Sequence, residues 1–144
     1  MRHFINCKFT KKDGSEVNIN NISNISWSVD RATAPNGHVG MKGHRIYNIG
    51  FQRIRSLQNE NVAQLENETI ELASATEQKA YFDGEITVAR ADDANDIIQT
   101  IRWKNGHICD LKNDIDGDEI TEIFEVSVTS LEINDSEFKR NVTA

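Results

Sequence analysis

The chain of 144 residues has one proline, two cysteines and fewer basic than acidic side chains. Its 16 Lys and Arg face 23 Asp and Glu, which gives a formal net charge of -7. Phosphate binding requires clustered Lys and Arg, so this balance argues against nucleic acid or an anionic membrane as the main partner. No stretch of eighteen apolar residues occurs, and MRHFINCKF at the start lacks an apolar run of signal-peptide length. We therefore expect folding in the cytosol, with no membrane insertion.

The cysteines and histidines do not form a recognisable redox or metal motif. Cys7 and Cys109 lie inside candidate strands with no CxxC spacing, so two reduced core thiols are favoured, with a disulfide between them as the alternative. The four histidines, His3, His38, His44 and His107, are scattered over turns and a chain end. In the acidic turn NDIDGDE, Gly117 would place Lys112 at the first ligand position of a calcium loop. We predict no metal site.

No pattern for catalysis appears either. The sequence contains no GxSxG nucleophile motif and no phosphate-binding GxxxxGK[ST] loop. Asp92 and Asp93 are two adjacent carboxylates, but nothing marks an apolar pocket that would separate their pKa values into an acid and a base. We therefore expect a protein without enzymatic activity and without a cofactor.

The longest β-type pattern runs from residue 97 to 133. Phe124, Val126 and Val128 alternate with polar residues, as in a half-buried strand. Leu131 and Ile133 then lie on what had been the polar side. A shift of one residue turns every side chain to the opposite face, so this jump predicts a bulge, a corner or a change of partner strand. The pattern favours a bent or closed sheet.

Further alternating segments predict more strands around this one. They centre on the apolar residues Ile5, Cys7 and Phe9; Val17 and Ile19; Ile25, Trp27 and Val29; Tyr47, Ile49 and Phe51; Phe82, Ile86 and Val88; and Ile97, Ile101 and Trp103. Trp27 and Trp103 are both in phase with apolar neighbours, so both are predicted in the core. KKDG before Ser15 and ADDAND are predicted hairpin turns.

Between residues 56 and 78 the apolar spacing changes to three and four residues, which predicts one amphipathic helix in the first part. The TIELASA segment at its end is compatible with either helix or strand. The sum is seven or eight short strands and one helix in a single domain, residues 1–144. The predicted fold class is mainly β, with two packed antiparallel sheets forming a β-barrel and one α-helix.

Two surface features point to contacts with other chains. A small sheet leaves strand edges with unpaired backbone groups, which proteins usually protect with Lys, Pro, bulges or closure. The strand ITEIFEVSVTSLEI is long and contains neither Lys nor Pro. The segment 31–44 contains the only proline and three glycines, and it exceeds the usual connection length. It is either a mobile surface loop or an arm that docks on a neighbouring subunit.

Three segments of the chain carry a family resemblance: ISWSVDR at 25–31 followed by ATAPNGHV, IRWKNGHICDL at 101–111, and EIFEVSVTSLEI at 122–133. These segments resemble the tube protein of type VI secretion systems, the haemolysin-coregulated protein. The resemblance covers most of the chain, from about 25 to 133, and rests on strand and turn patterns. It leaves open a type VI tube or the related tail tube of a contractile phage or phage-like particle.

The resemblance implies six copies in a ring, with rings stacked into a hollow tube inside a contractile sheath. Its partners would be further copies of itself, the sheath and tip proteins, and effector proteins passing through; assembly would occur in the cytoplasm and secretion by injection. The expected subunit-contact loop comprises Ala34, Pro35, Asn36, Gly37, His38, Val39, Gly40 and Met41. The small polar side chains Ser26, Ser28, Asn48 and Gln52 are candidates for facing the lumen. A monomeric β-barrel that binds a ligand in an apolar cavity is the alternative.

Overall fold

The computed structural model describes residues 4–20, 22–30, 46–56, 69–90 and 92–139. Its elements are β1 Phe4–Lys11, β2 Glu16–Ile19, β3 Ile22–Asp30, β4 Ile46–Ser56, a helix at 69–74, the 3₁₀-helix η1 Glu77–Ala80, β5 Phe82–Arg90, β6 Asp93–Asp116, β7 Glu119–Val128, β8 Ser130–Ile133 and β9 Ser136–Lys139. The described part thus has nine strands, where the sequence predicted seven or eight. The predicted antiparallel, mainly β fold with one α-helix is confirmed.

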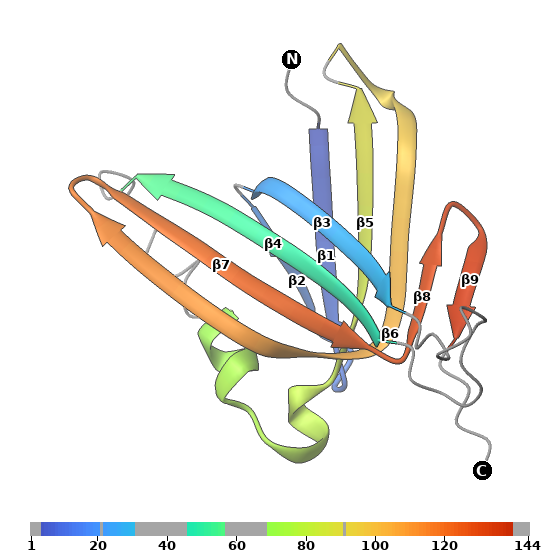
Figure 1. Cartoon of the computed structure of the whole chain (residues 1–144), viewed down its shortest axis with the longest axis horizontal. Helices are drawn as coiled ribbons and strands as arrows, with labels where there is room; N and C mark the ends of the chain where they lie inside the picture. The colour runs from blue at the N-terminus through green and yellow to red at the C-terminus, as the bar shows by residue number, and fades with distance from the viewer. Residues whose placement is uncertain (1–3, 21, 31–45, 57–68, 91, 140–144) are drawn as a thin grey trace, which may run out of the picture.

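The strands pair in the order β2-β1-β5-β6-β7-β4-β3, and β8 pairs with both β6 and β9. Strand β6 belongs to two layers. Its first part, up to Gly106, pairs with β5 and β8, whereas its second part, from His107, pairs with β7. We call β2, β1, β5, the first part of β6, β8 and β9 layer one, and β3, β4, β7 and the second part of β6 layer two. Figure 1 shows β1 and β5 nearly upright behind the oblique β3, β4 and β7.

The corner between the layers explains the jump in the apolar pattern. β7 ends at Val128, and β8 begins at Ser130 on the same edge of β6 but in the other layer. Opposite this point β6 bends at Asn105, whose φ of 55° lies in the left-handed region. The Asn105 amide donates to Asp83 Oδ1 at 3.0 Å, and its side chain bonds Lys12 of the β1–β2 turn. Of the three predicted alternatives, the structure shows the corner: β7 and β8 both pair with β6, but in different layers.

Aromatic side chains from five strands fill the space between the layers. Phe9, Phe51, Phe82, Trp103 and Phe124 are each at most 3% exposed. The rings of Phe51 and Phe124 are stacked, with centroids 4.6 Å apart, and Phe9 contacts all four other rings. Such contacts between β1 and the strands of layer two join the two layers into one core.

Two expectations about single segments are settled by the structure. The helix at 69–74 lies within TIELASA, so the strand alternative for that segment is wrong; Val62 and Leu65 of the expected helix lie outside the described residues. Trp27 is 36% exposed, so its predicted place in the core is wrong. The reason is that β3 is the last strand of layer two and has a paired strand on one side only. The Trp27 indole donates to Gln99 Oε1 across the layers at 3.2 Å.

Candidate assembly surfaces

The four side chains expected to face a lumen lie on one outward face of layer two. Ser28 pairs with Asn48 across β3 and β4; on the same side, Ser26 lies two residues from Ser28, and Gln52 lies four residues from Asn48. Both serines are exposed, and Asn48 and Gln52 are half-buried. The opposite side of β4 carries core residues, so strand alternation alone directs these polar groups outward. Their position in a lumen stays a prediction.

This face continues onto β7 and β6, where sequence reasoning did not follow it. Asn48 pairs with Ser127, and Gln52 pairs with Ile123. Ile123 and Ile54 are both exposed and interrupt the polar surface at one end. A strip of exposed isoleucine beside small polar groups is suited to contact with another protein surface. Period-two alternation continued from Phe124 would have placed Ile123 outward.

The expected subunit-contact loop, Ala34 to Met41, lies outside the described residues. Its role as an arm stays a prediction.

A buried ionic network, which sequence reasoning missed, connects β4, β7 and the helix. Arg53 Nε donates to Glu122 Oε1 at 2.9 Å, and Arg55 Nη2 donates to Glu122 Oε2 at 3.3 Å. The Thr69 hydroxyl, in the described part of the helix, donates to the same Oε2 at 2.9 Å and accepts from Arg53 Nη2 at 3.3 Å. All four side chains are buried. Charges in a core have to be paired and hydrogen-bonded, so this network fixes where the helix sits.

The sequence did contain a sign of this network. Arg53 and Arg55 are in phase with Phe51 on the core side of β4, and Glu122 is in phase with Phe124 on β7. Charged residues in core phase on two neighbouring strands predict a buried ion pair when the strands are in register. Here Arg53 pairs directly with Glu122.

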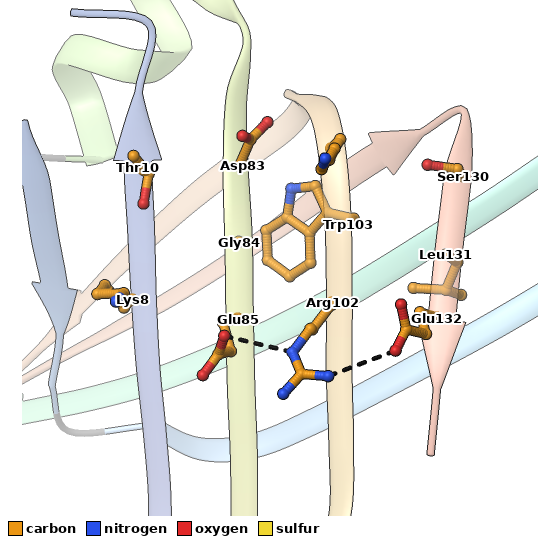
Figure 2. A pocket seen from close by; sticks show the side chains of 11 residues that line it. Lys8, Thr10, Asp83, Gly84, Glu85, Arg102, Trp103, Ser130, Leu131 and Glu132 are labelled. Atoms are coloured by element: carbon orange, nitrogen blue, oxygen red, sulfur yellow. Dashed lines mark hydrogen bonds and ion pairs between the residues drawn. The ribbon is translucent and has the colours of Figure 1, made fainter. Parts of the chain in front are cut away.

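A hollow of about 500 Å³ lies on the outer face of layer one. Figure 2 shows Arg102 crossing it between Glu85 and Glu132. Arg102 lies between two carboxylates, 3.3 Å from Glu85 Oε2 and 3.3 Å from Glu132 Oε1. The hydrogen bond that Arg102 Nε donates to Glu85, supported by both carboxylate charges, raises the pKa of Arg102 above its usual value. The guanidinium therefore stays charged and links β5, β6 and β8 across the surface.

The sulfur atoms and the remaining polar groups form no further centre in the described part of the chain. Both cysteines are free thiols, so the disulfide alternative is wrong. Cys7 is buried as expected, but Cys109 is exposed, so its expected place in the core is wrong. Among the residues that the structure describes, no three His, Cys, Asp or Glu side chains are grouped as a metal site would need. Asp93 accepts the Asn95 amide hydrogen at 3.0 Å, as in a tight turn. Within the same residues, no helix has the length and apolar character to cross a membrane.

Solved structures provide the decisive comparison, since no family model and no curated protein matches the chain. Hcp1 from Flavobacterium johnsoniae aligns with a TM-score of 0.60 at 15% identity, over 94% of this chain and 99% of that one. Hcp1 from the E. coli EAEC 042 pathovar aligns with a TM-score of 0.66 at 10% identity, over 93% and 95%. The chain has the fold of the Hcp proteins.

A chain from a prophage baseplate also has a similar fold. A chain in the baseplate of the anti-feeding prophage aligns with a TM-score of 0.53 at 12% identity, over 92% of this chain and 93% of that one. Hcp is the haemolysin-coregulated protein, so the family resemblance seen in the sequence is confirmed at the level of the fold. The alignments with Hcp1 cover nearly the whole of both chains. The single domain over residues 1–144 stays a prediction.

Proposed function

We propose that this chain is a structural subunit of the inner tube of a contractile injection machine. Copies associate into rings of six, and the rings stack inside a sheath, with effector proteins and a tip complex as further partners. The observation that carries the proposal is the match along nearly the entire chain to Hcp proteins, such as Hcp1 from Flavobacterium johnsoniae, at 94% and 99% coverage.

The open ends of the strand order support self-assembly. The path of paired strands ends at β2 on one side and at β3 on the other, and no pairing joins these edges among the described residues. Unpaired edges are readily satisfied by another chain. Contacts between different patches close into rings when the rotation permits and stack when translation repeats. The aromatic core leaves little space for the ligand chamber of the monomeric alternative.

The polar face of layer two is the proposed lining of the lumen. Ser26, Ser28, Asn48 and Gln52 present small uncharged groups, which stay hydrated and offer no strong contact to a passing protein. The segment from Ala34 to Met41 is the proposed arm between subunits.

Native mass spectrometry and negative-stain micrographs of the purified chain test the assembly. We expect rings of six copies and stacked tubes at high concentration. Shortening Ala34 to Met41 should leave a folded subunit, by circular dichroism, that assembles only at higher concentration. A chain that remains monomeric at high concentration would contradict the tube proposal.

Thiol labelling tests the lumen. In a Cys109→Ser background, Ser28→Cys in assembled tubes should react with a small maleimide but not with a large polyethylene glycol maleimide. Lys8→Cys, on the outer face of layer one, is the matched control and should react with both. Equal reaction of both positions with the large reagent rejects the lumen assignment. Tube formation is tested separately by the micrographs.

A further inference from the structure

A groove with an apolar floor separates the β1–β2 turn from the helix. It has a volume of about 340 Å³ and is lined by Lys11, Lys12, Asp13, Glu71, Leu72, Ala75 and Lys79. Leu72 and Ala75, which flank the end of the helix, provide the apolar floor. The rim carries three lysines against two acids.

The acids of this rim are engaged within the chain. Asp13 accepts hydrogen bonds from the amide and the hydroxyl of Ser15 at 2.8 and 2.6 Å. Glu71 lies 4.0 Å from Lys11. In the described part of the chain Lys79 has no ion-pair partner. The groove therefore offers an apolar floor beside a basic rim.

Ile115, at the end of the β6–β7 hairpin, forms an exposed apolar knob. Ile115 is 68% exposed, the highest value among the large apolar side chains that the structure describes. It lies between Asp114 and Asp116, and Asp118 follows after Gly117, whose φ of 58° makes the turn. An exposed isoleucine at the tip of a hairpin gains free energy when another apolar surface covers it.

The tip cannot reach the groove of its own chain. Figure 1 shows the β6–β7 turn at one end of the long axis of the molecule and the β1–β2 turn near the middle of its lower side. The residues of β7 that follow the tip are held in register along β4 and β6 up to Val128. The knob is thus presented to a different molecule.

We propose that the β6–β7 tip of one copy docks in this groove of a second copy, with Ile115 against Leu72 and Ala75. The negative charge of Asp114, Asp116 and Asp118 in the tip then lies near Lys79, which has no ion-pair partner in the described part of the chain, so charge complementarity adds to the apolar contact. The proposal rests on the proposed function, since it names a contact between assembled subunits. The contact joins different patches, so it can close a ring or continue from ring to ring. It forms one anchor of a larger interface.

Cross-linking between two populations tests the contact directly. One preparation carries Ile115→Cys and the other Ala75→Cys, both with Cys109→Ser to remove the exposed native thiol. After mixing and mild oxidation, we expect a reducible dimer that forms only when both preparations are present. Pairing Ile98→Cys with Ala75→Cys is the matched control, because Ile98 is an exposed isoleucine in the first part of β6. Equal yields from the test pair and the control pair overturn the proposal.

Charge exchange tests the orientation. Asp116→Lys and Lys79→Glu should each raise the concentration for half-assembly, and the double variant should return towards the wild-type value. Ile115→Thr keeps a β-branched side chain and should raise that concentration about tenfold or more, whereas Ile98→Thr should leave it unchanged. Circular dichroism confirms that each variant is folded.

The outcomes separate this contact from the tube proposal. Wild-type tubes together with normal assembly of Ile115→Thr and Lys79→Glu, and no specific cross-link, reject the docking and leave the tube proposal intact. A specific cross-link without rings supports the docking and rejects the tube. If the wild-type chain does not assemble and the mixed cysteine variants give no specific cross-link, both proposals are rejected.

Discussion

Trp103 lies over the backbone of its cross-strand partner Gly84, in the space that a side chain at position 84 would occupy. The same ring is close to Gly106, so two positions without side chains accommodate one indole at the corner of β6. Trp103 also contacts Phe9, Phe51 and Phe82, and it therefore couples the corner between the layers to the aromatic core.

Gly84→Ala should destabilise the fold by about 1–3 kcal/mol, because the new methyl group overlaps a ring that close packing prevents from moving. Gly50→Ala is the matched control in β4. There the added methyl group would meet only Ser26 Oγ, at 2.8 Å, and an exposed serine can rotate away. Urea denaturation of the two variants measures the difference. Equal losses would mean that Trp103 is not confined at Gly84.

Glu122→Ala should cost about 3–5 kcal/mol of unfolding free energy, because it leaves the buried Arg53 and Arg55 without the carboxylate between them. Glu125→Ala, on the outward side of the same strand, should change stability by less than about 1 kcal/mol. Denaturant titration of both variants checks this contrast. A small effect at Glu122 would show that water or neighbouring groups replace the carboxylate.

Stability should fall above about pH 8.5, the ordinary range of a thiol, through Cys7. Burial raises the pKa of the Cys7 thiol, against a smaller opposing effect of Arg53. In the unfolded chain the thiol loses its proton in this range while the folded chain retains it, so the unfolded state binds fewer protons and is favoured as pH rises.

The matching measurement compares unfolding free energy from pH 7 to 10 in wild type and Cys7→Ala. The wild-type curve should fall more steeply, by up to about 1.4 kcal/mol per pH unit. Parallel curves would show that Cys7 makes no contribution to the pH dependence.

The two tryptophans should differ in fluorescence quenching. Trp27 is 36% exposed at the edge of layer two, whereas Trp103 is buried. Acrylamide should therefore quench the emission of Trp103→Phe strongly and that of Trp27→Phe weakly. Strong quenching of Trp27→Phe would mean that Trp103 is open to solvent.

Sequence patterns predicted the fold class because alternation is a local property. The first hairpin and the strand around Tyr47, Ile49 and Phe51 followed from period-two spacing. The phase jump before Leu131 located the corner, although the bend at Asn105 on the opposite strand gave no comparable sign. The strand count exceeds the predicted seven or eight because the corner divides one apolar run into β7 and β8, and because Asn134 and Asp135 turn the chain into β9.

The sequence by itself determined which faces of the strands are apolar and where the hairpins turn. It also contained strand and turn patterns in an order that resembles Hcp. Only the tertiary structure decided that Trp27 lies at an open edge and that Arg53, Glu122 and Thr69 share one buried site. The tertiary structure also decided that Ile115, at the β6–β7 hairpin, is exposed. The reason is physical: alternation specifies the direction of a side chain relative to its own strand, but burial depends on how many other strands lie over it.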